Sequence, residues 1–382
     1  MKVFHQDRAR RKGIAVGVLA ASMLASVLSL APAAHAQPNW VEVESCDVDD
    51  LIEAVEIANA EDDIDTIVID EKKCDYEFET PYRDGVFTAN ALPLITDDLT
   101  IYGNRAQMEN DGDFFMRFLE AAPDVDVELR DMTIEDFVLR VPGASGDPVI
   151  AGGAILMDGG DLTLRNVTLE DNEVIVLDAD GADVIGGGAI ASLGGSVTLR
   201  SSTVKGNEVS LVNLLDPGLT IAAAGGVGVD GDADSVLTIE ASTVKGNKVS
   251  ATGIGGSALA GAGGVAAIDG ARLVMTGSSV TSNTASARAS NGAANLAVAE
   301  AGGVFADDTE DDDGHVITNS KIDGNKASAE GGALAIAVGG GLINLDEDGP
   351  SDDADAADGL VMNGGSISSN KATCDDVCVA LG

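Results

Sequence analysis

Apolar and polar residues alternate in segments that recur from residue 127 to residue 370. Six of these segments end at an asparagine, and an earlier, divergent one ends at Phe137. The asparagines are Asn172, Asn207, Asn247, Asn283, Asn325 and Asn370. Apolar residues stand eight and three positions before each anchor, as Leu164 and Leu169 do before Asn172. Alternation of this kind predicts strands with one buried face, stacked so that like residues form columns.

A pair of glycines followed by a small or apolar residue precedes each asparagine anchor. The pairs begin at Gly152, Gly187, Gly225, Gly263, Gly302 and Gly339. Both landmarks recur every 35 to 45 residues, a period typical of a solenoid or a propeller blade. Propeller blades carry regular aromatic signals, whereas Phe305 is the one aromatic residue inside the Gly-Gly repeats. The pattern therefore predicts an all-β chain folded as a right-handed parallel β-helix, with its repeat rungs at 127–373.

Each repeat is longer than a minimal solenoid rung, which begins at roughly 20 residues. The excess lies between each asparagine and the next glycine pair, in Ala-, Val- and Gly-rich stretches such as 209–224 and 284–301. We expect one expanded rung per repeat, with the excess projecting as hairpins or as a side sheet.

Residues 37–126 differ in composition from the Gly-Gly repeats, because ten of the eleven aromatic residues after position 36 lie from Trp40 to Phe137. Val48, Leu51 and Val55 share one face of an amphipathic stretch, and strand-like runs follow at 66–69 and 99–102. This region predicts a short cap helix and the first rungs, since an uncapped solenoid end would expose unpaired strand edges.

Several motifs resemble known families. Leu51-Ile52-Glu53-Ala54, Ala58-Asn59, Leu92-Pro93 and Gly103-Asn104 resemble the N-terminal region of CSLREA-domain proteins. The Gly-Gly and Asn landmarks are similar to those of chlamydial polymorphic membrane proteins and other pectin-lyase-like β-helices, although Val or Ile replaces the phenylalanine of the Phe-x-x-Asn motif. The resemblance implies the fold; the superfamily contains lyases, hydrolases, epimerases and non-catalytic adhesins.

Residues 1–36 read as an export signal. A basic start that includes Arg10 and Arg11 precedes the apolar run 14–30, and Ala34-His35-Ala36 provides a small-residue cleavage site. No later segment has the roughly 20 apolar residues of a membrane-spanning helix. We therefore expect a secreted or cell-surface protein, with periplasmic or extracellular residence left open.

Four cysteines lie near the two ends of the exported chain. They fit an exported protein, because disulfides persist in oxidising compartments outside the cytoplasm. Pairing each with its near neighbour predicts Cys46–Cys74 in the cap region and Cys374–Cys378 in a stapled C-terminal end at 374–382. Four cysteines allow three connectivities, so proximity alone favours this one.

The net charge is −42, and removal of the five basic residues and one acidic residue of the signal leaves 17 basic and 63 acidic side chains, or −46. Such a field opposes binding to nucleic acid or to an anionic membrane. Calcium, a saline habitat and plain solubility each explain it. Only His315 remains after the signal, which removes His-based zinc sites and makes it a weak catalytic candidate.

Acidic residues gather just after each Gly-Gly strand. The best local match to a calcium loop is Asp230, Asp232 and Asp234, because oxygen ligands at alternating positions suit this ion, although the distal bidentate Glu is missing. Solvated acidic turns explain the same pattern.

Three arginines, Arg130, Arg165 and Arg200, stand seven residues before their anchors, and Glu240 takes that position in the next repeat. Stacked guanidinium groups suit the carboxylates of an acidic polysaccharide, which makes Arg165 and Arg200 candidate catalytic residues of a calcium-assisted lyase. A charge ladder neutralised by neighbours such as Glu128 and Glu240 is the plainer interpretation.

These observations favour a secreted, non-catalytic structural or adhesion component at a cell surface. No cofactor is expected, and calcium is the one ion whose binding the acidic residues leave open. Its expected partners are proteins or polysaccharides at a surface, and a second copy of the chain is one of the candidate protein partners. The alternative is a polysaccharide lyase acting on acidic polysaccharide. The asparagine column is expected to be structural, since stacked amides can bond from rung to rung.

Overall fold

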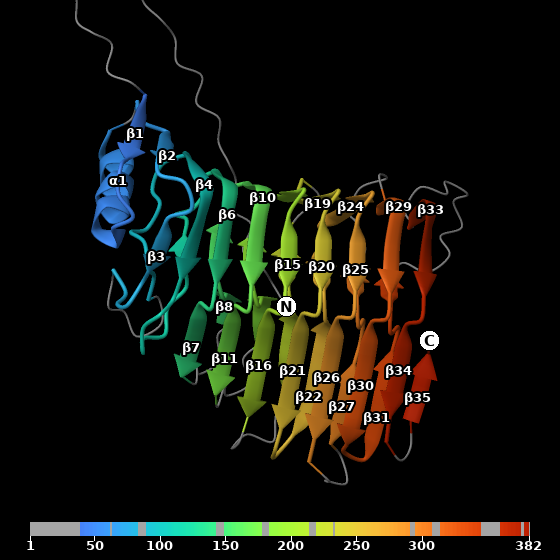
Figure 1. The fold of residues 1–382 in the computed structure, drawn as a ribbon. Helices are drawn as coiled ribbons and strands as arrows, with labels where there is room; N and C mark the ends of the chain where they lie inside the picture. The colour runs from blue at the N-terminus through green and yellow to red at the C-terminus, as the bar shows by residue number, and fades with distance from the viewer. Residues whose placement is uncertain are drawn as a thin grey trace, which may run out of the picture. The chain divides into compact units, whose positions relative to one another are not determined.

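The chain coils through four parallel β-sheets, visiting each of them once per repeat (Figure 1). The computed structural model describes residues 39–381, apart from 62, 83–88, 143–148, 178–182, 214–218, 232–233, 291–294, 308–313, 345–359 and 376–377. The described residues belong to one unit, Pro38–Gly382. The predicted all-β parallel solenoid with a short N-terminal helix is confirmed.

The first sheet contains the alternating segments that precede the anchors. Its strands are β1 (Trp40–Val43), β2 (Thr66–Ile69), β3 (Asp75–Glu77), β4 (Leu99–Glu109), β6 (Val127–Glu135), β10 (Leu162–Glu170), β14 (Val197–Arg200), β15 (Thr203–Lys205), β19 (Val236–Glu240), β20 (Thr243–Lys245), β24 (Arg272–Thr276), β25 (Ser279–Thr281), β29 (Val316–Asp323) and β33 (Val361–Ser368).

The second sheet begins directly after the anchors. Its strands are β7 (Val138–Pro142), β11 (Glu173–Leu177), β16 (Glu208–Asn213), β21 (Lys248–Gly253), β26 (Thr284–Ala289), β30 (Lys326–Gly331) and β34 (Lys371–Cys374). The third sheet follows, with β8 (Val149–Gly152), β12 (Asp183–Gly187), β17 (Leu219–Ala224), β22 (Ser257–Ala262), β27 (Leu296–Ala299), β31 (Leu334–Val338) and β35 (Cys378–Leu381).

The fourth sheet follows the glycine pairs and closes the rung. Its strands are β5 (Leu119–Glu120), β9 (Ile155–Asp158), β13 (Ile190–Leu193), β18 (Val227–Asp230), β23 (Val265–Ile268), β28 (Val304–Ala306) and β32 (Leu342–Asn344). The glycines permit close packing of backbone, since a Cβ at Gly153 would lie 2.0 Å from the carbonyl oxygen of Gly188.

Register shows that one repeat makes one rung. Leu164 of β10 lies opposite Leu129 on one side and Leu199 on the other, so neighbouring strands are one repeat apart in the sequence. The expected expanded rung is therefore confirmed, and its excess length forms the second and third sheets.

The interior is divided by side-chain size. Leu, Ile, Val and Met from the first and fourth sheets form one apolar cluster, in which Leu164 and Ile239 are fully buried. The second and third sheets enclose a separate cluster that becomes almost entirely alanine toward the C-terminus, for example Ala287, Ala299 and Ala329. The Ala-rich stretches of the sequence are therefore interior positions of two additional sheets.

Helix α1 (Val48–Ala60) forms the predicted cap against β1 and β2. The side chain of Asp47 accepts a hydrogen bond from the Asp49 N–H at the N-cap, and Leu51 and Val55 are completely buried. Among the described residues, no helix is long and apolar enough to cross a membrane.

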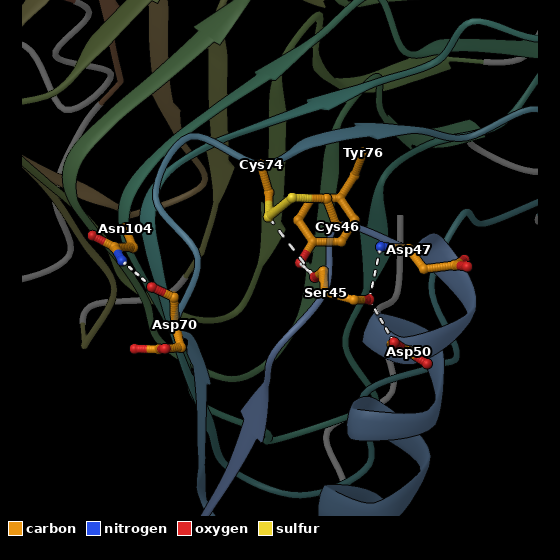
Figure 2. The surroundings of a disulfide bond; sticks show 8 residues. All are labelled: Ser45, Cys46, Asp47, Asp50, Asp70, Cys74, Tyr76 and Asn104. Atoms are coloured by element: carbon orange, nitrogen blue, oxygen red, sulfur yellow. Dashed lines mark hydrogen bonds between the residues drawn. A yellow bond between two sulfur atoms is a disulfide. The ribbon is translucent and has the colours of Figure 1, made fainter.

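The Cys46–Cys74 disulfide, which is confirmed, joins the residue before the helix N-cap Asp47 to the residue before β3 (Figure 2). Tyr76 packs beside it and donates from its hydroxyl to the Ser45 carbonyl at 2.9 Å. Burial, followed by the charges of Asp50 and Glu71, raises the pKa of Tyr76 to about 12, so the phenol stays a donor. The side chain of Cys378 lies outside the described residues, so the Cys374–Cys378 pairing stays a prediction.

Candidate functional site

The anchor asparagines form a continuous hydrogen-bonded ladder inside the turn between the first and second sheets. Oδ1 of Asn247 accepts from the backbone N–H of Asn207 at 3.0 Å and from its Nδ2 at 2.9 Å. Nδ2 of Asn247 in turn donates to Val204 O and to Oδ1 of Asn283 at 3.0 Å each. The same pattern runs from Asn172 to Asn370. These amides bind the backbone and one another, as expected of a structural column.

A second ladder, which the sequence interpretation missed, lies five residues before the anchors. The backbone N–H of each serine donates to the hydroxyl of the serine one rung on, from Ser202 to Ser242 at 3.0 Å, then to Ser278 and Ser320 at 3.1 Å each. All four serines are buried. Their constant distance from the anchors was the available signal.

A third ladder, also missed, is acidic. The Asp126 N–H donates to Oδ1 of Asp98 at 2.9 Å, and the Asp161 N–H donates to Oδ1 of Asp126 at 2.8 Å. Ser196 continues the column by donating from its N–H to Asp161 at 2.9 Å. These aspartates and Asp65 line an open hollow of about 320 Å³ beside the strand starts of the first sheet. One oxygen of each of these three carboxylates therefore holds the next rung in place.

The arginine column is formed as predicted, and each member meets a carboxylate. Arg130, Arg165 and Arg200 lie opposite one another on β6, β10 and β14, followed by Glu240 on β19. Arg130 and Arg165 both contact Glu128, and Nε of Arg200 lies 3.0 Å from Glu240 Oε2.

The energetics of this column fit a charge ladder. Although burial opposes it, the hydrogen bonds from Arg130 and Arg165 lower the pKa of Glu128. Arg130 also stacks over the Tyr102 ring, with its guanidinium carbon 4.7 Å from the ring centroid. Arg165 and Arg200 are 41% and 43% exposed, so solvent screens these ion pairs.

The predicted calcium residues are only partly described, because Asp232 lies outside the described residues. Asp230 ends β18 and Asp234 lies exposed in the turn that follows. The structure instead brings Asp230 together with Asp269 of the next rung. Burial first, and then the charge and hydrogen bond of Asp269, raise the pKa of Asp230 to about 6.

His315 is buried among backbone groups. Its Nδ1 accepts from the Leu273 N–H at 3.0 Å, which leaves Nε2–H to donate to the Asp307 carbonyl at 2.6 Å. Both ring nitrogens therefore bind backbone groups, and the imidazole links three segments of neighbouring rungs. This geometry gives His315 a structural role.

The tightest carboxylate cluster among the described residues was not foreseen. Oxygens of Glu109, Glu135 and Asp136 lie within 4.8 Å of one another at the ends of β4 and β6. Burial, and then Glu170, Asp136 and Glu109, raise the pKa of Glu135. Gln107 donates to Glu135 and, at 3.3 Å, to Glu109. The 26-residue offset between Glu109 and Glu135 differs from the repeat period, which hid the pairing in the sequence.

Comparison with protein-family models, curated proteins and solved structures yields no match to this chain.

Proposed function

We propose that this protein is an exported, non-catalytic β-helix that serves as a structural or adhesive component at a cell surface or outside the cell. The observation that supports this proposal is the pairing of its arginine column. A lyase needs a guanidinium group that is available to bind a substrate carboxylate. Arg165 meets Glu128 and Arg200 meets Glu240 within the chain itself.

The regular polar groups of the repeats support the same role. The asparagine and serine ladders hydrogen-bond from rung to rung, and His315 bonds backbone on both sides. Groups used in this way extend a solenoid, because each rung supplies the acceptors of its neighbour. They make the rungs rigid and leave recognition to the outward-facing side chains.

The outer face of the second sheet offers one such recognition surface. Ser210, Ser250 and Ser286 stand opposite one another on β16, β21 and β26 with half-buried side chains. Ser328, next in the column, is buried, and the half-buried Thr373 follows it. A flat row of hydroxyls at the strand spacing of about 4.8 Å suits an extended hydrophilic partner such as a polysaccharide or a protein strand.

Calcium is a second proposal, favoured by the Asp230 and Asp269 pair. Burial and the neighbouring Asp269 carboxylate raise the pKa of Asp230, and a divalent cation bound between the two side chains would replace the proton that Asp230 holds. Calorimetric titration of the chain beginning at Gln37 with millimolar calcium tests it, and an Asp230→Asn variant is the control. Absence of heat in both would overturn the calcium role and leave the scaffold proposal intact.

Assay of the purified chain on alginate, pectate and other polyuronates tests the main proposal. We expect no ultraviolet-absorbing unsaturated ends, with or without calcium. Product formation that disappears in chelator and in Arg165→Ala or Arg200→Ala variants would establish the alternative, a calcium-dependent lyase. Tagged full-length chain should also be found outside the cytoplasm by protease accessibility of intact cells; retention inside would contradict the proposed location.

A further inference from the structure

Charged residues along the turn between the first and second sheets are segregated by sign. We call this row the seam strip. It consists of the four residues before each anchor position and the one residue after it. In the N-terminal rungs the strip presents only carboxylates among its charged groups: Asp75, Glu77, Glu109, Glu135, Asp136, Glu170, Asp171 and Glu173. In the C-terminal rungs it presents amines: Lys205, Lys245, Lys248, Lys321, Lys326 and Lys371.

Ion pairs within the chain neutralise the middle of the strip. Lys205 pairs with Glu170 at 2.5 Å, where the acidic half meets the basic half. Lys248 also pairs with Glu208, one of the two acids in the basic half; the other, Asp323, pairs with Lys321 at 2.9 Å. The centre of the strip is therefore satisfied by its own rungs.

The two flanks are not satisfied in this way. Within the described part of the chain, Lys245, Lys326 and Lys371 make no ion pair, and all three are exposed. On the acidic side, Glu135 and its neighbours crowd one another, since Glu109, Glu135 and Asp136 bring oxygens within 4.8 Å. Burial and the other carboxylates raise the pKa of both Glu135 and Asp136, and the charge of Lys205 only partly offsets this for Glu135.

From this arrangement we infer that the seam strip is a self-complementary interface through which two copies of the chain associate side by side, with their solenoid axes antiparallel. A two-fold axis between the rungs of Glu170 and Lys205 places the acidic half of each copy on the basic half of the other. Such an interface is isologous, so Glu135 of one copy faces Lys245 of the second, and the reverse.

Spacing favours a second copy over other partners. The charges follow the strand spacing of about 4.8 Å per rung, and a second copy repeats that spacing. Three of the four acidic rungs then face a rung with lysine, and the rung of Glu109 faces the uncharged rung of Asn283. A polyanion would match the basic half only, and a polycation the acidic half only. The inference deepens the proposed scaffold role by naming one partner, but it does not depend on where the protein resides or on the absence of lyase activity.

The net charge of −42 sets the conditions for association. Long-range repulsion between two such chains is screened in about 0.1 M salt, where the Debye length is about 10 Å, while contacts between paired side chains persist. In about 1 M salt the Debye length falls to about 3 Å and the pairs themselves weaken. We therefore expect a weak dimer that is favoured at intermediate salt.

Sedimentation velocity on the chain beginning at Gln37 tests the inference. We expect a monomer–dimer equilibrium in about 0.1 M salt, and a dissociation constant at least roughly tenfold larger in about 1 M salt. Lys245→Glu and Glu135→Lys, each alone, should abolish the dimer, because each places like charges opposite one another. The chain carrying both substitutions should dimerise again, since the reversed pair is complementary.

Lys72→Glu is the matched control, because Lys72 is exposed and lies outside the strip. It should leave the dimer unchanged. A wild-type chain that stays monomeric at high protein concentration in about 0.1 M salt would overturn the inference. So would a dimer that survives Lys245→Glu, or a double variant that remains monomeric. None of these results depends on the polyuronate assay, so failure here and failure of the proposed function are distinguishable.

Discussion

Nδ2 of Asn247 donates to Oδ1 of Asn283 at 3.0 Å, and the backbone N–H of Asn247 donates to the same oxygen at 2.9 Å. One amide therefore fixes both the side chain and the main chain of the preceding rung. Because both asparagines are completely buried, water cannot replace these bonds. The register of the turn thus depends on the same residue type in each of the six repeats that end at an asparagine.

Replacement of Asn247 by alanine should reduce the free energy of unfolding by about 3 kcal/mol, because the buried donors of Asn207 lose their acceptor. Chemical denaturation monitored by circular dichroism measures the change. Asn370→Ala is the matched comparison, since Asn370 is half-buried and is the last asparagine of the ladder. Equal losses for the two variants would contradict the cooperative role of the inner rungs.

The bend in the middle of each first-sheet strand gives a prediction of opposite sign. Ala241 adopts a φ of 49°, in the left-handed region, and Gly277 takes the corresponding position one rung on with a φ of 58°. A side chain at such a φ is strained. Ala241→Gly should therefore raise the free energy of unfolding by up to about 1 kcal/mol. Ala333→Gly is the control, because Ala333 is exposed and its φ lies outside the left-handed region; it should be neutral or destabilising.

The repeat could be predicted from the sequence because the same positions are buried in successive rungs. Leu164, Leu199 and Ile239 stack because an apolar residue is required at the same place in each rung. The asparagine at the anchor of each repeat was likewise enough to predict the asparagine column.

Contacts that break the repeat period were not predictable in this way. Glu109 meets Glu135 across a shorter N-terminal rung, and Asp230 meets Asp269 through a turn whose shape the residue pattern does not specify. The Ala-rich stretches were expected to project as hairpins or as a side sheet, but nothing in their composition showed that two sheets would bury them against each other. Small side chains indicate close packing without indicating the partner.

The raised pKa of Asp230 makes stability depend on pH. The folded chain holds this proton up to a pH of about 6, whereas the unfolded chain releases it near 4. The stabilising contribution of the protonated form is thus fully present below pH 4 and is lost as pH rises through about 6. We expect Asp230→Asn to gain roughly 1 to 2 kcal/mol over the parent at pH values above about 7, and little or nothing near pH 4.

Unfolding of parent and variant at both pH values measures this difference directly. Asp63→Asn is the control, because Asp63 is exposed and should give the same small difference at both pH values. If the advantage of Asp230→Asn proved independent of pH, the shared proton would not be its cause.

Loss of the Cys46–Cys74 bond should act on the cap before the rest of the solenoid. The bond closes a loop with a sequence separation of 28 residues that contains α1 and β2, and a loop of that length corresponds to roughly 3 to 4 kcal/mol of chain entropy. Solenoid rungs contact only their neighbours, so the loss should stay local. In a Cys46→Ala, Cys74→Ala variant, hydrogen exchange should accelerate in residues 48–60 while amides of β20 and β25 remain protected. Added reductant should produce no further change at the cap of this variant, and uniform acceleration along the chain would show instead that the cap and the rungs unfold together.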